Sequence, residues 1–170
     1  MESMDGIIKN RVAESGLITL DPEMFRPKDR QLEYDLRKNL FLDQILKEKD
    51  FRQALLETDW TLYKGAQVAI FCSVEAIIPL WAFMLLAGYL EPYAKGVFRG
   101  NLSEMESYLW HMEIQAFNFE EFRNKRVVVK GCGDLPIPES VYVELTLNLR
   151  PIVKNLMFGE PCSTVPLFKN

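Results

Sequence analysis

Short apolar and β-branched runs alternate along most of the chain with stretches of helical periodicity. From residue 66 onward the expected order is strand, helix, strand, helix, strand, helix, strand. This alternation is typical of a mainly parallel sheet covered by helices. The pattern predicts an α/β fold with helices on both faces of one sheet, a Rossmann-like or flavodoxin-like three-layer arrangement. The expected strands are 67–72, 95–99, 126–130 and 163–169, and the expected helices are 78–93, 102–116 and 141–156.

The three expected helices differ in character. Residues 78–93 are apolar on nearly every face, which predicts a helix packed on both sides. Asn101 and Glu104 form a capping-box pair ahead of apolar residues spaced three and four apart, which predicts a helix from residue 102. The last helix is amphipathic from Val141 to Leu156, and Pro151 is expected to kink or break it.

The amino-terminal part is less regular. Residues 1–35 are expected to form an arm or edge strands, with Gln31–Leu36 alternating as an edge strand does. With 48% hydrophobic and 26% charged residues, the composition is that of a folded protein. A length of 170 residues is enough for one core, so we expect a single domain over 1–170.

Charge, apolar length and cysteine content limit the classes of binding partner and the cellular locations that are expected. A net charge of −4 and a pI near 5.2 provide no basic patch, so nucleic acid is not an expected partner. The apolar part after Glu75 is shorter than the ~20 residues that span a bilayer, so no membrane association is expected. The amino end lacks a secretory pattern, and the odd number of cysteines fits a reducing compartment, which together predict a cytoplasmic protein.

The most informative stretch is Arg126–Glu139, where three valines lead into a thiol between two glycines. Gly131 and Gly133 let the backbone turn sharply at Cys132 and let another group approach it closely. The thiol would lie at the carboxyl end of a strand and just before a helix. Open α/β sheets bind their ligands at this place.

A second thiol ends an earlier strand in a similar context. If the two thiol-bearing strands are neighbours, their ends lie about 4.8 Å apart. Two thiolates bound to one zinc or iron ion at ~2.3 Å lie nearly 4 Å apart, so this spacing suits a shared metal. Asp134 or Glu75 could supply an oxygen ligand. A faint internal repeat links the two regions: Tyr63-Lys64-Gly65, a strand, Cys72 and Pro79, against Phe122-Arg123-Asn124, a strand, Cys132 and Pro138.

Cys162 lies among the turn-forming residues 159–166, which favours a loop over a core position. A continuous helix from Glu139 to Met157 would be about 28 Å long and would carry the chain to the opposite edge of the sheet. Cys162 would then be too far from Cys132. It could join the site if the break at Pro151 turns the chain back, or if another copy of a homo-oligomer supplies it.

Other interpretations of the thiols stay open. Free cysteine is often a small buried hydrophobic residue, which gives an adaptor protein with inert thiols. Alternatively, Cys132 could be the activated nucleophile of a thiol enzyme or transferase, since a helix amino end lowers a thiol pKa. The only histidine, His111, falls on the polar face of its helix and is expected to be solvated, which removes Cys-His catalysis within one chain. The lack of a base near the thiols favours metal binding over catalysis.

Three long motifs and two shorter segments of the chain carry a resemblance to a known family. The motifs are Phe71–Ala82, Val129–Ser140 and Gly159–Pro166, and the segments are Asn10–Asp21 and Glu48–Phe51. Together they resemble Domain of Unknown Function 2480, an uncharacterised family found chiefly in Bacteroidetes. The resemblance implies a bacterial protein without an established activity, and it suggests a role beside iron–sulfur assembly proteins. The hypothesis is therefore a cysteine-based iron or zinc site made by Cys72, Cys132, Asp134 and Cys162.

Overall fold

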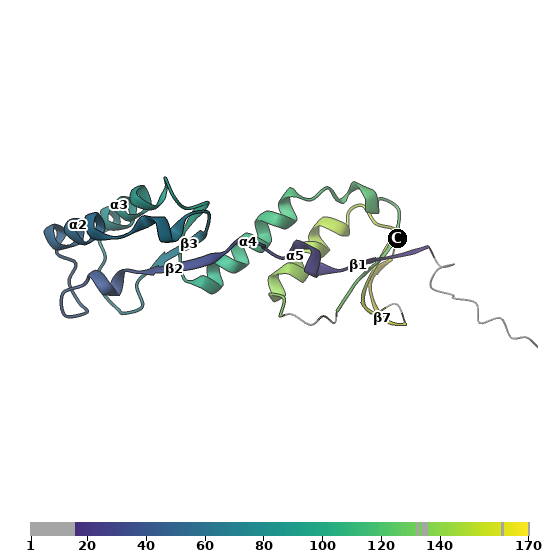
Figure 1. Cartoon of the computed structure of the whole chain (residues 1–170). Helices are drawn as coiled ribbons and strands as arrows, with labels where there is room; N and C mark the ends of the chain where they lie inside the picture. The colour runs from purple at the N-terminus through teal and green to yellow at the C-terminus, as the bar shows by residue number, and fades with distance from the viewer. Residues whose placement is uncertain (1–15, 132, 134–135, 161, 170) are drawn as a thin grey trace, which may run out of the picture. The chain divides into compact units, whose positions relative to one another are not determined.

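The structure is a computed structural model that describes residues 16–131, 133, 136–160 and 162–169 (Figure 1). The strands form two separate sheets, with the orders β1-β5-β6-β7 and β2-β3-β4. The chain divides into two compact units. The first unit consists of Met1–Arg26 and Trp110–Asn170, and the second unit is Pro27–Leu109. Each unit is described by itself below.

The second unit is a three-stranded parallel sheet with helices packed on it. Its core combines β3 residues Val68 and Ile70 with helix residues such as Leu55 and Leu86, all at most 3% exposed. The elements are β2 (Gln31–Asp35), the 3-10 helix η2 (Leu36–Asn39), α2 (Glu48–Glu57), η3 (Trp60–Tyr63), β3 (Gln67–Phe71), α3 (Leu80–Leu90), β4 (Gly96–Arg99) and the start of α4 (Leu102–Ala116).

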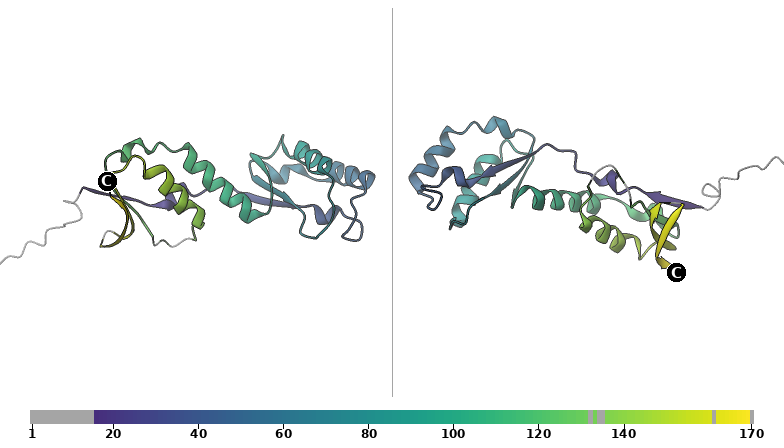
Figure 2. Two further views of the ribbon diagram at one scale, coloured as in Figure 1. Left: turned by 180° about the vertical axis from the view of Figure 1, so that it is seen from behind. Right: turned by 90° about the horizontal axis from the view of Figure 1, so that it is seen from below.

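The first unit is built from two separate parts of the chain. Strands β1, β5 and β6 are parallel, and β7 closes the sheet in antiparallel pairing with β6. The end of α4 and helix α5 lie beside the sheet (Figure 2), and their buried residues form one core with it. The elements are β1 (Leu17–Leu20), η1 (Pro22–Phe25), η4 (Phe119–Phe122), β5 (Arg126–Val129), α5 (Glu139–Leu149), β6 (Asn155–Glu160) and β7 (Ser163–Lys169).

The two units repeat one pattern of elements. Positions from Asp59 to Gly100 correspond to positions 59 residues later, from Asn118 to Gly159. Each segment contains a 3-10 helix, a buried strand, a loop ending in proline, an 11-residue helix and a second strand. The fully buried helix positions also coincide. They are Ala82, Leu86 and Leu90 in α3, against Val141, Leu145 and Leu149 in α5.

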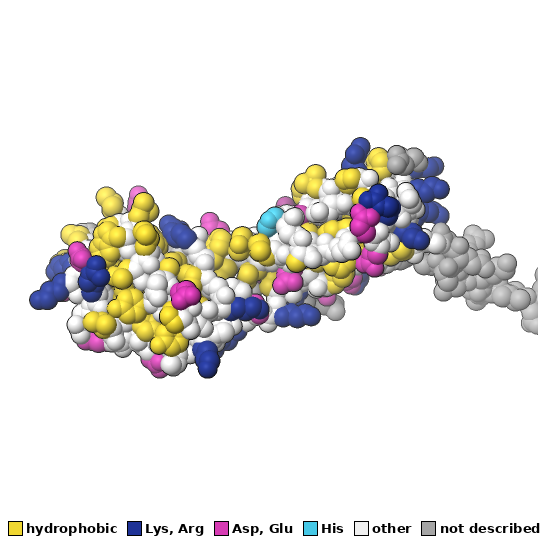
Figure 3. Space-filling model, turned by 90° about the horizontal axis from the view of Figure 1, so that it is seen from above, with side chains coloured by type: hydrophobic (Ala, Val, Ile, Leu, Met, Phe, Trp, Pro, Cys, Tyr) yellow, Lys and Arg dark blue, Asp and Glu magenta, His cyan; other side chains and the backbone are white. Residues whose placement is uncertain are grey.

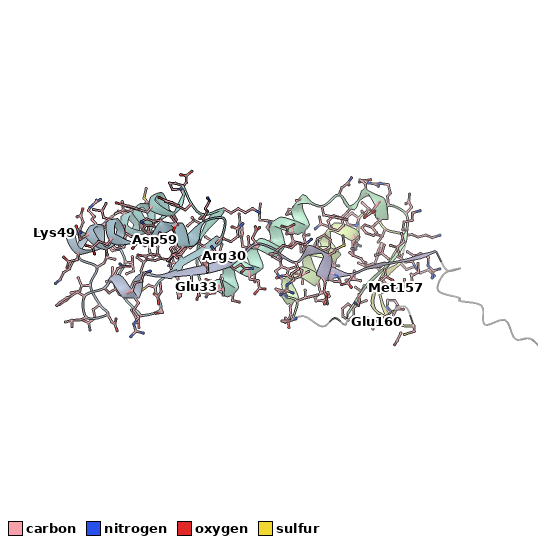
Figure 4. The ribbon with its side chains drawn as sticks, in the orientation of Figure 1. Arg30, Glu33, Lys49, Asp59, Met157 and Glu160 are labelled. Carbon is pink, nitrogen blue, oxygen red and sulfur yellow. The ribbon has the colours of Figure 1, made fainter. Side chains whose placement is uncertain are left out.

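Local bonds follow the same repeat. Asp59 (labelled in Figure 4) caps η3 by accepting from the N–H of Thr61, and Asn118 caps η4 in the same way. Gly65 and Asn124 both have positive φ, +69° and +60°, which glycine and asparagine tolerate best. The N–H of each donates to a carbonyl just beyond the following helix: to Tyr93 O at 2.9 Å and to Ile152 O at 2.8 Å.

The first strand of each unit ends in an aspartate with the same role. Asp35 is the last residue of β2 and accepts hydrogen bonds from the N–H groups of Arg37 and Ser73. Asp21 follows β1, accepts from the N–H of Glu23 and pairs with Lys130 Nζ at 2.8 Å. Each carboxylate therefore caps a 3-10 helix and ties the end of the first strand to the segment after the central strand. The internal repeat that the sequence suggested extends over both units.

The structure confirms a mixed α/β fold with mainly parallel sheets, and β2 is an edge strand as expected. The three-layer arrangement around one sheet is not confirmed, because the strands belong to two sheets. The single domain over 1–170 stays a prediction. In the part of the chain that the structure describes, no helix is long and apolar enough to cross a membrane.

Two helix predictions were wrong in detail. The last helix does not continue to residue 156: α5 ends at Leu149, Pro151 lies in the turn, and Leu156 is in β6. Helix α3 is not packed on both sides, because Leu80 and Met84 are 80% and 74% exposed. The sheet covers one face of α3, and nothing described within the second unit covers the other.

Candidate functional site

The carboxyl ends of β5 and β6 form one candidate site in the first unit. The two strands are parallel neighbours, with Val129 opposite Phe158. Cys132 is three residues beyond Val129, but Cys132 and Asp134 lie outside the described residues. Their neighbours are described: a Cβ on Gly131 would fall 2.5 Å from Phe158 Cζ, and one on Gly133 would collide with Glu23 Oε1. A side chain at Gly131 would require the Phe158 ring to shift, and one at Gly133 would require the Glu23 carboxylate to move, so the two glycines let these groups approach the backbone closely.

Cys162 lies in the turn that joins β6 to β7, and its thiol is free and exposed. The sequence left two placements of Cys162 open, and the chain turns back after the break at Pro151. Because α5 stops at Leu149, the helix runs back along the sheet and β6 then returns parallel to β5. Cys162 therefore follows the end of β6 at the same edge as the loop that follows β5.

Several carboxylates surround this edge. The hydrogen bond from Lys130 lowers the pKa of the Asp21 carboxyl below its usual value, even though burial opposes the shift. The same bond raises the pKa of Lys130 against the opposing effect of burial, and the charges of Asp21, Glu23 and Glu160 add to the increase. Glu160, labelled in Figure 4, ends β6. Its Oε1 is buried and has no hydrogen-bond partner within the described part of the chain.

Cys72 does not share a sheet with the other two cysteines. It follows β3, whose neighbours are β2 and β4, whereas the neighbours of β5 are β1 and β6. The condition on which a metal shared by Cys72 and Cys132 depended, that their strands are neighbours, is therefore not met. The physical reason is the repeat itself, since each central strand is enclosed by strands of its own unit. In the repeat, Cys72 corresponds to Gly131, and Cys132 to Ser73.

The second unit has a pocket at the carboxyl edge of its own sheet. Its volume is about 710 Å³, and Cys72 and Glu75 are among its lining residues. The sequence analysis missed its other polar residues, Arg99, Asn101 and Glu104. The capping box of α4 is formed as expected, with the Asn101 N–H donating to Glu104 at 2.8 Å and the Glu104 N–H donating to Asn101 at 2.9 Å. The signal available in the sequence was the position of Arg99 at a strand end, just before this capping box.

His111 is half exposed (cyan in Figure 3), as expected, and it has a carboxylate partner. Its Nδ1 lies 2.6 Å from Glu144 Oε1, which also accepts a hydrogen bond from Gln115 at 2.7 Å. These three side chains bridge α4 and α5 and line a groove of about 640 Å³. No thiol lines this groove, so His111 has no described cysteine partner.

Among the described residues, no group of three or more histidine, cysteine or acidic side chains is arranged to hold a metal ion. This leaves the predicted ligand set of Cys72, Cys132, Asp134 and Cys162 untested, because two of its members lie outside the described residues. Zinc or iron as a cofactor is likewise untested. The free thiols of Cys72 and Cys162 are compatible with several chemistries.

The fold and the two carboxyl edges define a mixed α/β protein made of one repeated parallel unit. The family described as "Protein of unknown function (DUF2480)" matches residues 6–170, and the chain belongs to this family. This match confirms the resemblance found in the sequence. No curated protein and no solved structure matches the chain.

Proposed function

We propose that the chain binds an iron or zinc ion through thiolates at the carboxyl edge of the first unit. Cys132 and Cys162 supply the sulfur ligands, and Asp134 supplies an oxygen ligand. The observation that carries the proposal is the parallel pairing of β5 with β6. Strand neighbours lie about 4.8 Å apart, and two thiolates on one metal lie nearly 4 Å apart, so loops from these two strands can share an ion.

The charges at this edge support a cation. Glu23 and Glu160 border it, and Lys130 is held by Asp21. The buried, unpartnered Oε1 of Glu160 is a further oxygen that a metal or a metal-bound water could satisfy. A thiolate site in a reducing compartment also agrees with the predicted cytoplasmic location.

The proposal leaves Cys72 out of the ligand set, because its strand belongs to the sheet of the second unit. A role beside iron–sulfur assembly proteins rests on the family resemblance, and it would follow if the bound metal is iron. A homo-oligomer is no longer needed to bring Cys162 to the site, although the chain could still form one.

Metal content tests the proposal directly. The protein is purified without oxygen, and metal per chain is measured for wild type, Cys132→Ser, Cys162→Ser and Cys72→Ser, with circular dichroism to check folding. We expect about one metal per chain in wild type and in the matched control Cys72→Ser, with loss in the other two variants. Full retention of metal in Cys132→Ser or Cys162→Ser would reject the site.

The alternative, a thiol enzyme or transferase with Cys132 as nucleophile, makes a different prediction. The metal-free protein would then show fast, selective alkylation of Cys132 compared with the exposed thiol of Cys162. An adaptor with inert cysteines predicts neither metal nor selective labelling. The same three variants therefore distinguish all three functions.

A further inference from the structure

The pocket of the second unit shares no residue with the thiolate site proposed above and has a composition of its own. Its volume of about 710 Å³ is within the range of small-molecule sites. Apolar side chains make up most of the wall, including Ile78, Phe83 and Leu80. The pocket opens beyond the carboxyl ends of parallel strands, where α/β proteins commonly bind ligands.

Arg99 is the only cation among the described residues that line the pocket. Its guanidinium carbon lies 4.7 Å from the centre of the Phe83 ring, which holds the group by a cation–π contact. Within the part of the chain that the structure describes, no carboxylate pairs with it. Glu104 also lines the pocket, but one of its oxygens accepts the Asn101 N–H. Arg99 therefore has donors free for an anionic ligand.

An exposed apolar rim adjoins the pocket. Ile77, Leu80 and Met84 are 91%, 80% and 74% exposed, and the last two are one turn apart on α3. Figure 3 looks down on the face that carries α2 and α3 and shows apolar side chains gathered over it. Exposed apolar surface of this kind beside a pocket marks a binding site. A ligand that covers this rim must itself be apolar over much of its length.

We propose that this pocket binds a single-chain amphiphile with a carboxylate head, the chemical class of fatty acids. The carboxylate pairs with the planar fork of Arg99, and the hydrocarbon chain lies along Phe83, Ile78, Leu80 and Met84. One arginine matches one carboxylate. A phosphate dianion fits less well, because Glu75 and Glu104 border the same pocket and Arg99 is the one cation among the described residues that line it.

Titration calorimetry of the full-length protein with monomeric decanoate, and with two ligands that differ only in the head group, tests the contributions of the ligand's head group and of its hydrocarbon chain separately. Decanol and decylammonium have the same chain with a neutral and a cationic head. We expect decanoate to bind about tenfold or more tightly than decanol, and decylammonium to be the weakest. Equal binding of decanol, tighter binding of decylammonium, or no binding of decanoate would overturn the proposal.

Two variants and a matched control locate the site. Arg99→Gln should bind decanoate no better than decanol, and Met84→Gln, a polar and uncharged change at a position 74% exposed, should weaken all three decyl ligands. Arg52→Gln is the control, because Arg52 also rests on a ring, 5.9 Å from the centre of Trp81, but does not line the pocket. Undiminished binding of decanoate by Arg99→Gln would overturn the assignment.

Thiol protection gives a second measurement on the same protein. Cys72 lines the pocket, whereas Cys162 belongs to the other unit and is exposed. Saturating decanoate should slow alkylation of Cys72 by iodoacetamide severalfold and leave the rate at Cys162 unchanged. Equal rates with and without decanoate, or binding to zwitterionic phospholipid vesicles without binding of monomeric decanoate, would reject the pocket as a fatty-acid site.

Discussion

In both units an aspartate ties the end of the first strand to the segment after the central strand, but the two carboxylates bind different groups. The strand-ending carboxylate of Asp35 accepts two backbone N–H groups, whereas that of Asp21 binds the charged side chain of Lys130. Burial alone would raise the pKa of Asp35, but the hydrogen bonds from Ser73 and Arg37 outweigh it and lower the pKa. Both aspartates should therefore stabilise the fold above their unfolded pKa, and this contribution should be lost as the pH falls through the lowered value.

Tyr34 provides a test at high pH. Its side chain is fully buried, its hydroxyl donates to Asn39 at 3.1 Å, and burial raises the pKa of the phenol from 10.0 to about 12. The neutral phenol contributes its full stabilisation below the unfolded pKa near 10, and the contribution is lost as the pH rises toward 12. Spectrophotometric titration should show Tyr34 ionising well after the exposed tyrosines, and Tyr34→Phe should remove that part of the late change; burial also raises the pKa of Tyr63. Ionisation of every tyrosine near pH 10 in the folded protein would contradict this environment.

The sequence predicted correctly the roles of residues that depend only on their neighbours along the chain. The capping pair of Asn101 and Glu104 and the solvated His111 needed only nearby residues to be predicted. The partner of His111, Glu144, is on another helix and could not be foreseen. Arg99 was likewise missed, because its place in a pocket depends on how β4 lies beside β3.

At the scale of elements, the missed strand β6 had the largest consequence. The apolar spacing of Ile152 and Leu156 fits a helix as well as it fits a short strand. Pairing with β5 decides in favour of the strand, and that pairing is not visible in a single sequence. Helix α3 was misjudged for a related reason: an apolar composition on all faces does not mean that every face is covered.

The equivalence of α3 and α5 predicts matched effects on stability. Leu86 and Leu145 are each 0% exposed at corresponding positions, so alanine at either should lower the free energy of unfolding by about 2–5 kcal/mol. Their exposed counterparts Met84 and Val143 are 74% and 62% exposed, and alanine there should change it by less than about 0.5 kcal/mol. Urea unfolding measures all four variants. A large loss in Met84→Ala or Val143→Ala would mean that these faces are covered.

At the scale of the whole molecule, the chain is one unit repeated, with the second copy inserted into the first. The first unit takes β1 from the start of the chain and its remaining strands from residues after 110. The sequence showed the repeat only as a faint similarity around Cys72 and Cys132, and it predicted correctly whether most elements are helices or strands. It could not indicate that β1 pairs with β5, because the whole second unit lies between these strands in the sequence and a contact over that separation leaves no local pattern. The division of the strands into two sheets was unpredictable for the same reason.

Cys132 and Cys162 follow the neighbouring strands β5 and β6, so we infer that both thiols lie at the carboxyl edge of the sheet of the first unit. Disulfide mapping shows whether the two thiols can meet. Metal-stripped protein is oxidised mildly with diamide, digested, and its disulfide-linked peptides are identified by mass spectrometry. Disulfide formation requires Cα atoms about 4.4–6.8 Å apart, so only thiols that can meet are joined. We predict an intrachain link between Cys132 and Cys162, formed equally in Cys72→Ser. A link between Cys72 and Cys132 in place of it, or no link between Cys132 and Cys162, would contradict the account.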